Sequence, residues 1–246
     1  LTWQRVGFVY QGRMEDQAEL RVMIDLGHAE REARRIGDLL ASLRKRHDLA
    51  RFEYTKLIRI QPAGPTHSHP ILTLGTRFAE TEDLLLSTYL HEQMHWYLWR
   101  LGGPDHDPIA PFFDELVRRY PKAPTKLPEG ARSYEQTYLH LVVCWLEVTA
   151  AAELIGWERA AAIAQTTWGY RWIYRTVLED WEPLEGLLRE HGLVPMRPPA
   201  DLDREERIRK RDALSAGPRR KKPAAPPPPS RKGRRKAPVR GGTLVG

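Results

Sequence analysis

The 246-residue chain contains a single cysteine, Cys144. One thiol can form neither an intramolecular disulfide nor a cysteine-based zinc site, and a chain without disulfides is typical of a reducing compartment. The first residues, 1–5, lack the basic start and apolar run of a signal peptide. The longer apolar runs meet a charge or a histidine well short of a membrane span. We therefore expect a cytoplasmic protein with no membrane-spanning segment.

Acidic residues are missing from the C-terminal stretch 217–246. It carries ten of the 39 Lys and Arg and none of the 32 Asp and Glu, which leaves 29 basic against 32 acidic residues before it, a net charge of −3. The formal charge of +7 therefore belongs to the tail. Its basic clusters alternate with prolines, a composition that cannot bury enough apolar surface to fold. We expect a disordered tail over 217–246, able to bind nucleic acid without sequence preference, and a charged linker over 196–216.

The N-terminal part of the chain mixes strand and helix patterns. Alternating polarity over 5–10 and 18–25, on either side of Gly12, predicts a β-hairpin. Apolar residues at helical spacing predict an amphipathic helix over 28–47 that lies on a sheet, and strand character returns over 51–60.

The C-terminal half has helical patterns only. The predicted helices span 108–120, 133–155, 157–165, 170–180 and 183–191, with breaks at Gly156, Gly169 and Gly192. Its aromatic residues are expected to be core: Trp168, Tyr170, Trp172, Tyr174 and Trp181. With 41% hydrophobic residues, the chain can bury a proper core. We expect one α+β domain over 1–195, with an α/β part over 5–101 and a helical part over 108–192.

The pentapeptide His91-Glu92-Gln93-Met94-His95 lies in a stretch, 80–101, that has the marks of a helix. Thr81 is a suitable N-cap, and Gly102-Gly103-Pro104 ends the pattern. Histidines four residues apart on one helical face can hold one metal ion, with the glutamate beside it. Neutral imidazoles favour Zn²⁺. We predict that His91 and His95 bind zinc and that Glu92 deprotonates a metal-polarised water.

A catalytic zinc needs a third protein ligand, and the sequence offers three. His106 follows the motif closely. On the helix 133–155, a polar stripe runs along one line of an otherwise apolar surface, formed by Ser133, Gln136, Thr137, His140, Cys144 and Glu147. A buried polar stripe needs partners or a site. His140 is the first candidate for the third ligand, with Glu147 and His106 as alternatives, and the residue of the stripe that does not coordinate can orient a ligand imidazole.

The strand pattern over 71–77 follows Pro70, which places it at a sheet edge. A helix, a few strands ending in an edge strand, and then a helix bearing HExxH resemble the zincin-type metallopeptidases. The resemblance implies hydrolysis of a peptide bond and an edge strand that pairs with an extended substrate. With His106 as ligand, the motif resembles the Spartan-like DNA-repair proteases. With Glu147, it resembles the Glu-zincins, although the Asp expected three residues later is Ala150 here.

The roles of two smaller groups of residues are left open by the sequence. His67 and His69 could form a second metal site or a solvated loop, and Tyr89, Tyr134 or Tyr138 could stabilise an oxyanion. The sequence thus predicts a zinc-dependent hydrolase, in first place a metallopeptidase acting on a peptide or protein. The alternative is a nucleic-acid-associated or scaffold protein that acts through the basic tail, with a structural or inactive zinc site.

Overall fold

The computed structural model of the chain describes residues 20–24, 30–61, 64–75, 81–102 and 107–215. The predicted strand over 5–10, His106 and the basic tail lie outside these residues. The chain divides into two compact units, residues 1–207 and 208–246, and the candidate site lies wholly in the first.

The described part of the chain is α+β and mostly helical, with eight α-helices and one three-stranded sheet. The strand order is β1 (Arg21–Ile24), β2 (Leu57–Ile60) and β3 (Leu72–Leu74), and both neighbouring pairs are parallel. The helix α1 (Glu30–Arg46) connects β1 to β2 and packs on them, as the sequence predicts. It buries Ala33, Ile36, Leu40 and Leu43.

The strand predicted over 51–60 is wrong in its first half. Residues Leu49–Phe52 form a 3-10 turn, and β2 begins only at Leu57. Phe52 and Tyr54 are buried, but they reach the core from this turn and the segment after it. The alternation of apolar Phe52 and Tyr54 with polar residues therefore gave a strand pattern to a segment that is not extended.

The strand β3 is the last in the sheet order, as expected for an edge strand, but its outer edge is covered. The backbone N–H and C=O of Thr73 pair with His67 at 2.8 and 3.0 Å, and the Gly75 N–H donates to Thr66 Oγ1 at 3.0 Å. We refer to residues 64–69 as the strap. The zincin resemblance implies that the backbone groups of the edge strand pair with an extended substrate. In this protein the strap occupies those groups.

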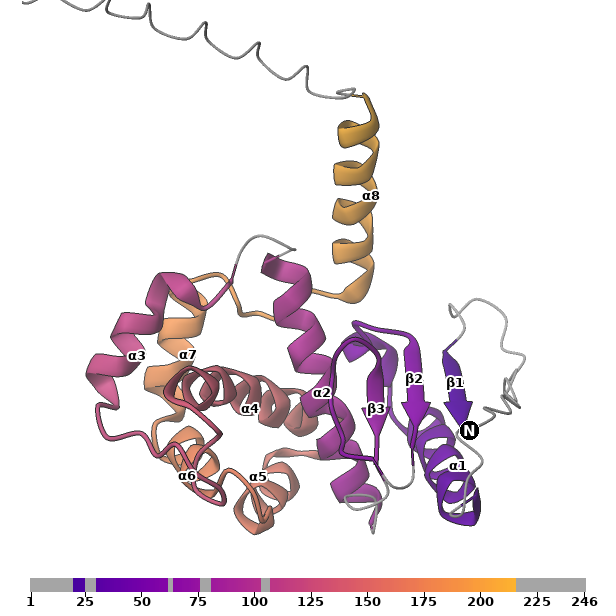
Figure 1. Cartoon of the computed structure of the whole chain (residues 1–246), viewed down its shortest axis with the longest axis horizontal. Coiled ribbons are helices and arrows are strands. Elements are labelled where there is room, and N and C mark those ends of the chain that lie inside the picture. Colours follow the sequence, from indigo (N-terminus) through magenta and orange to yellow (C-terminus); the bar gives the residue numbers. More distant parts are fainter. Residues whose placement is uncertain (1–19, 25–29, 62–63, 76–80, 103–106, 216–246) are drawn as a thin grey trace, which may run out of the picture. The chain divides into compact units, whose positions relative to one another are not determined.

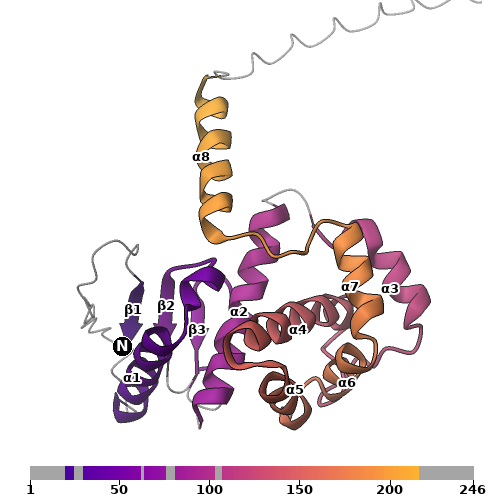
Figure 2. The same cartoon turned by 180° about the vertical axis from the view of Figure 1, so that it is seen from behind.

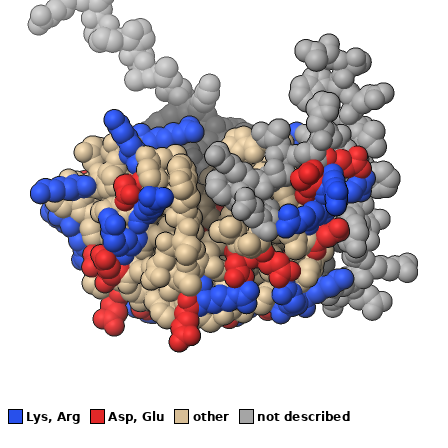
Figure 3. Space-filling model, turned by 90° about the horizontal axis from the view of Figure 1, so that it is seen from below, with Lys and Arg blue, Asp and Glu red and all other residues tan. Residues whose placement is uncertain are grey.

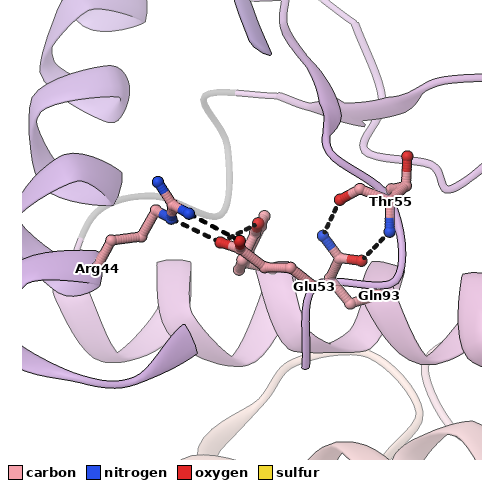
Figure 4. A network of polar contacts seen from close by, with 5 residues as sticks. Arg44, Glu53, Thr55 and Gln93 are labelled. Atoms are coloured by element: carbon pink, nitrogen blue, oxygen red, sulfur yellow. Dashed lines mark hydrogen bonds and ion pairs between the residues drawn. The ribbon is translucent and has the colours of Figure 1, made fainter. Parts of the chain in front are cut away.

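The motif helix α2 (Glu82–Gly102) begins as predicted, with Thr81 Oγ1 accepting from the Leu84 N–H at 3.2 Å. In Figures 1 and 2, α2 stands between the sheet with α1 on one side and the helices α3–α7 on the other. Figure 4 shows the contacts that fix α2 on the sheet side. Gln93 exchanges two hydrogen bonds with the backbone of Thr55, at 2.9 and 3.0 Å. The buried Glu53 accepts two bonds from Arg44, at 2.7 and 2.9 Å.

The helical half agrees with the sequence patterns, except that Trp168, predicted to be a core residue, is 58% exposed. Its elements are η3 (Ala110–Phe112), α3 (Phe113–Arg119), α4 (Tyr134–Ile155), α5 (Trp157–Thr166), α6 (Arg171–Glu179) and α7 (Trp181–Glu190). Contrary to the expectation that charges and histidines interrupt every apolar run, α4 is long and apolar enough to cross a membrane by length and composition. A buried core helix passes the same test, and α4 packs against α2, α5, α6 and α7.

The fold does not end at Pro195. The segment 196–216, expected to be a charged linker, contains the helix α8 (Pro199–Ser215). Proline is preferred at the first position of a helix, and Glu, Arg and Lys are good helix formers. Leu202 is buried, and Asp203 binds Arg100 of α2 at 2.6 Å.

Charged side chains of both signs lie next to one another on the face shown in Figure 3. The ion pairs of the first unit include Arg159 with Asp83 and Arg51 with Glu153. This mixing agrees with the near balance of charge before the tail.

Candidate metal centre

The site is built by two helices, α2 and α4, that pack against each other. On α2, Ser87, His91 and His95 succeed one another at intervals of four residues and therefore share a face. On α4, Ser133 caps the N-terminus by accepting from the Gln136 N–H at 3.2 Å, which fixes where the helix begins. His140 and Glu147 of the polar stripe face the motif on α2.

The three histidines predicted as ligands come together. One ring nitrogen of each of His91, His95 and His140 lies within 4.8 Å of the other two. The ring centroids are 5.1 Å apart for His91 and His95, 5.1 Å for His95 and His140, and 5.4 Å for His91 and His140. Three nitrogens within this limit form a group that could hold a metal ion, and zinc binds imidazole nitrogens at roughly 2.0–2.1 Å.

Two of the imidazoles have a fixed orientation. His91 Nδ1 lies 2.8 Å from Glu147 Oε2, and His140 Nδ1 lies 2.6 Å from the backbone oxygen of Gln136. Because both partners are acceptors, each Nδ1 carries the proton that it shares with the oxygen, and Nε2 is the nitrogen left to face the centre. Oxygen partners behind metal-binding imidazoles are the usual arrangement in zinc sites.

Glu147 orients His91 rather than joining the triad. Its two oxygens accept hydrogen bonds from Ser87 Oγ, from Tyr174 OH at 2.8 Å and from His91 Nδ1. A second group with metal-ligand geometry, His91, Cys144 and Glu147, shares this network. In that group the available atom of His91 is Nδ1, which already binds Glu147. A hydrogen-bonded support for His91 therefore explains the second group.

The protonation of the histidines differs within the triad. Burial and the charge of His91 lower the pKa of His140 to about 3 and hold that of His95 well below 6.5. Burial also acts to lower the pKa of His91, but its contacts with Cys144 and Glu147 outweigh burial and raise it. His95 and His140 are thus neutral at pH 7, whereas a metal ion that bound this group would have to displace a proton from His91.

Glu92 is buried beside the histidines, with 7% of its surface exposed. Burial raises the pKa of its carboxyl to about 7, the charge of His91 acts to lower it, and Glu147 adds to the rise. A carboxyl with this pKa can both accept and release a proton near neutral pH.

Tyr170 is the residue of the site that the sequence did not reveal. Its ring centroid lies 4.5 Å from that of His140 and 5.9 Å from that of His91. Its backbone is left-handed, with φ 60° and ψ 33°, a conformation that costs a residue other than glycine about 1–2 kcal/mol. Hydrogen bonds from Arg171 N to Pro128 O and from Trp172 N to Glu129 O hold the segment after it. The break between α5 and α6, predicted at Gly169, is therefore made by Tyr170.

The other predicted residues serve elsewhere. Tyr89 OH donates to Glu53 and Tyr138 OH donates to Tyr120 O, while Tyr134 is half exposed. His67 Nδ1 meets Pro65 O, and His69 stacks on Trp96. Among the described residues, neither His67 nor His69 belongs to a group with metal-ligand geometry.

A signal for Ser87 was present in its spacing. Ser87 precedes His91 by four residues on α2, which puts both on one side of the helix. Tyr170 offered no such signal, because it precedes α6 with a left-handed backbone. On α2, the Ser87 hydroxyl donates to Glu147, which binds His91 from behind. The Tyr170 ring lies against the His91 imidazole, and the Tyr174 hydroxyl donates to the Glu147 carboxylate that binds the same imidazole.

The centre thus combines three convergent imidazoles, a buried carboxyl of raised pKa and a strained tyrosine in one place. Such clusters of perturbed groups mark functional sites more often than structural ones. Comparison of the chain with protein-family models, with curated proteins and with solved structures finds no significant match. The chemistry of the site is therefore argued from its own geometry.

Proposed function

We propose that the protein is a zinc-dependent hydrolase, and specifically a metallopeptidase. His91, His95 and His140 hold the metal, and Glu92 is the general base. The observation that carries the proposal is the convergence of three ring nitrogens within 4.8 Å, two of them with Nδ1 bound to an oxygen. Three neutral nitrogen ligands and a neighbouring carboxyl fit a catalytic zinc, which keeps a fourth position for water or substrate.

Zn²⁺, when bound, supplies a Lewis acid at the open end of the three imidazoles. Glu92 takes a proton from water as the water oxygen bonds to the carbonyl carbon. It then passes that proton to the leaving nitrogen as the C–N bond breaks, so the products are a carboxylic acid and an amine. Tyr170 donates a hydrogen bond to the carbonyl oxygen as negative charge develops there. The raised pKa of Glu92, about 7, suits both transfers.

The order of elements also supports a zincin-like arrangement, in which α1 and a sheet precede the motif helix. In this protein α2 contacts α1 and β3 on one side and α4 on the other. The sheet-side contacts of Gln93 with Thr55 fix the rotation of α2, which turns His91 and His95 toward α4.

Metal analysis of purified variants tests the proposal. The wild-type protein should bind one zinc, and His91→Ala, His95→Ala and His140→Ala should each lose it. His47→Ala, at a partly exposed histidine of the α1 end, is the matched control and should keep it. Zinc retained by all three ligand variants would refute the assignment.

Two further variants separate binding from catalysis. Glu92→Gln should keep zinc and lower the rate of peptide hydrolysis by about 10²- to 10⁴-fold, the usual contribution of a positioned base. Tyr170→Phe should keep zinc and KM but lower kcat by about 10²-fold, as loss of one oxyanion donor does. Full activity of Glu92→Gln with zinc bound would remove its assigned role.

A further inference from the structure

The stripe of α2 that holds the metal ligands continues to the protein surface. Ser87, His91, His95 and Trp99 are spaced by four residues, so each lies only about 40° round the helix from the one before. Ser87 is 7% exposed, His91 8%, His95 is half-buried and Trp99 is 48% exposed. Exposure therefore rises along this stripe, which opens to the surface at the C-terminal end of α2. Because helical side chains lean toward the N-terminus, the Trp99 indole lies over the turn that carries His95.

Three aromatic rings gather at this opening, and we call them the aromatic rim: His69, Trp96 and Trp99. The His69 ring stacks on Trp96 with centroids 4.2 Å apart and an interplanar angle of 22°. Trp99 meets Trp96 edge to face at 5.3 Å and lies 6.0 Å from His69. His69 and Trp99 are both exposed. Such aromatic surface beside a reaction centre can gain free energy when a ligand covers it.

The aromatic rim is held in place before any ligand arrives. Trp96 Nε1 donates to the backbone oxygen of Ser68 at 2.8 Å, and His69 Nδ1 lies 2.9 Å from Ser68 Oγ. The strap that carries His69 is in turn paired to Thr73 of β3. Little ordering is therefore required on binding, which favours affinity.

The strap also decides how a substrate can be recognised. It takes the outward N–H and C=O of Thr73, so an extended peptide cannot add to β3 there as a further strand. Strand addition supplies affinity through the main chain, whereas side-chain pockets supply specificity. Because these main-chain groups are engaged, side chains must supply the recognition of a peptide next to the metal site.

We propose that the aromatic rim is the subsite for an aromatic or large aliphatic side chain of the peptide, next to the bond that is cleaved. This inference rests on the proposed function and adds the substrate class to it. The neighbouring cation on α2, Arg100, is paired with Asp203 at 2.6 Å, which weakens its attraction for an acidic side chain or a phosphate. Surfaces that stack nucleobases place their aromatic rings along a basic groove, whereas here the nearby arginine of α2 is already paired.

The test measures binding in the zinc-loaded Glu92→Gln protein, so that no peptide is cleaved. Labelled alanine-rich peptides carry one Phe, one Leu, one Asp or no substitution, and fluorescence anisotropy gives their affinities. The Phe and Leu peptides should bind at least about tenfold more tightly than the Asp peptide. Trp99→Ala should weaken the Phe peptide by about 10- to 100-fold and the unsubstituted peptide by less than about twofold.

The matched control is Trp157→Ala. Trp157 is 44% exposed, lies on α5 and packs edge to face on Trp181, so its loss removes a similar surface away from the rim. It should leave all affinities unchanged, and Trp99→Phe should restore part of the preference lost in Trp99→Ala. Circular dichroism confirms that each variant is folded.

Several outcomes would overturn the inference. Equal binding of the Phe and Asp peptides would do so, as would equal effects of Trp99→Ala and Trp157→Ala. An oligothymidylate that binds through Trp99, in place of the apolar peptides, would assign the rim to nucleic acid. Selective binding without any hydrolysis by the wild-type zinc protein would refute the proposed reaction and support the rim. Hydrolysis without a side-chain preference would refute the rim and support the reaction.

Discussion

Removing the Glu92 carboxyl is expected to steepen the loss of stability of the metal-free protein in acid. Burial, assisted by the charge of His91, lowers the pKa of His140 to about 3 and that of His95 well below 6.5. In the unfolded chain both histidines titrate near pH 6.5. Between about pH 5 and 6 the unfolded chain therefore binds about two more protons at these positions than the folded protein, and the free energy of unfolding falls as the pH falls.

Glu92 acts in the opposite sense. Burial raises the pKa of its carboxyl from 4.5 to about 7, so in this pH window the folded protein holds a proton that the unfolded chain has lost. This proton offsets one of the two histidines. The raised pKa of His91 leaves that ring protonated in both states below about pH 6, so it adds nothing to the slope. The net difference is about one proton, or about 1.4 kcal/mol of unfolding free energy per pH unit.

Glu92→Gln removes the offset, and the slope should rise to about 2.7 kcal/mol per pH unit. Urea unfolding with a chelator present, followed by tryptophan fluorescence at several pH values between about 5 and 6, measures both slopes. Glu158→Gln, at an exposed position of α5, is the control and should keep the wild-type slope. Equal slopes for wild type and Glu92→Gln would refute a protonated, buried carboxyl. A stability that rose toward acid in both proteins would refute the buried, neutral histidines.

Other perturbations test the support of the site and the tail. Glu147→Gln keeps an oxygen for His91 but removes the negative charge, and zinc affinity measured by chelator competition should fall about 10- to 100-fold; unchanged affinity would show that Glu147 does not act through His91. Glu147→Ala leaves three donors unpaired in the core, at about 1–3 kcal/mol each, and should abolish folding, as seen by circular dichroism. Deleting 217–246 should reduce retention on DNA and flatten its salt dependence; retention equal to that of the full chain would exclude the tail as an anchor.

Those parts of the site that depend on helical spacing were predictable from the sequence. The motif and its cap at Thr81 fix α2, and the polar stripe of α4 predicts the face that packs against it. His140 and Glu147 consequently reach His91 from the expected helix, His140 toward the centre and Glu147 behind it. Helical periodicity could not decide whether His140 or Glu147 joins His91 and His95, because both lie on the same line of α4.

The parts that depend on chain reversals and on long-range packing were not predictable. Tyr170 enters the site through a left-handed turn that is held by the backbone of Pro128 and Glu129, distant in sequence. The segment around the 3-10 turn at Leu49–Phe52 resembles a strand in sequence because apolar Phe52 and Tyr54 alternate with polar residues. The helix α8 follows a proline-rich stretch, where composition favoured a linker.

The strap also affects how the protein behaves at high concentration. An open strand edge is a template on which other chains add strands, and natural proteins cover such edges to avoid aggregation. Thr73 and Gly75 have their outward backbone groups engaged by residues of their own chain. A Cβ on Gly75 would lie 2.3 Å from the Gly64 oxygen, so only glycine permits so close a cover. The same few residues that direct a ligand toward side-chain recognition therefore protect this side of the sheet from self-association.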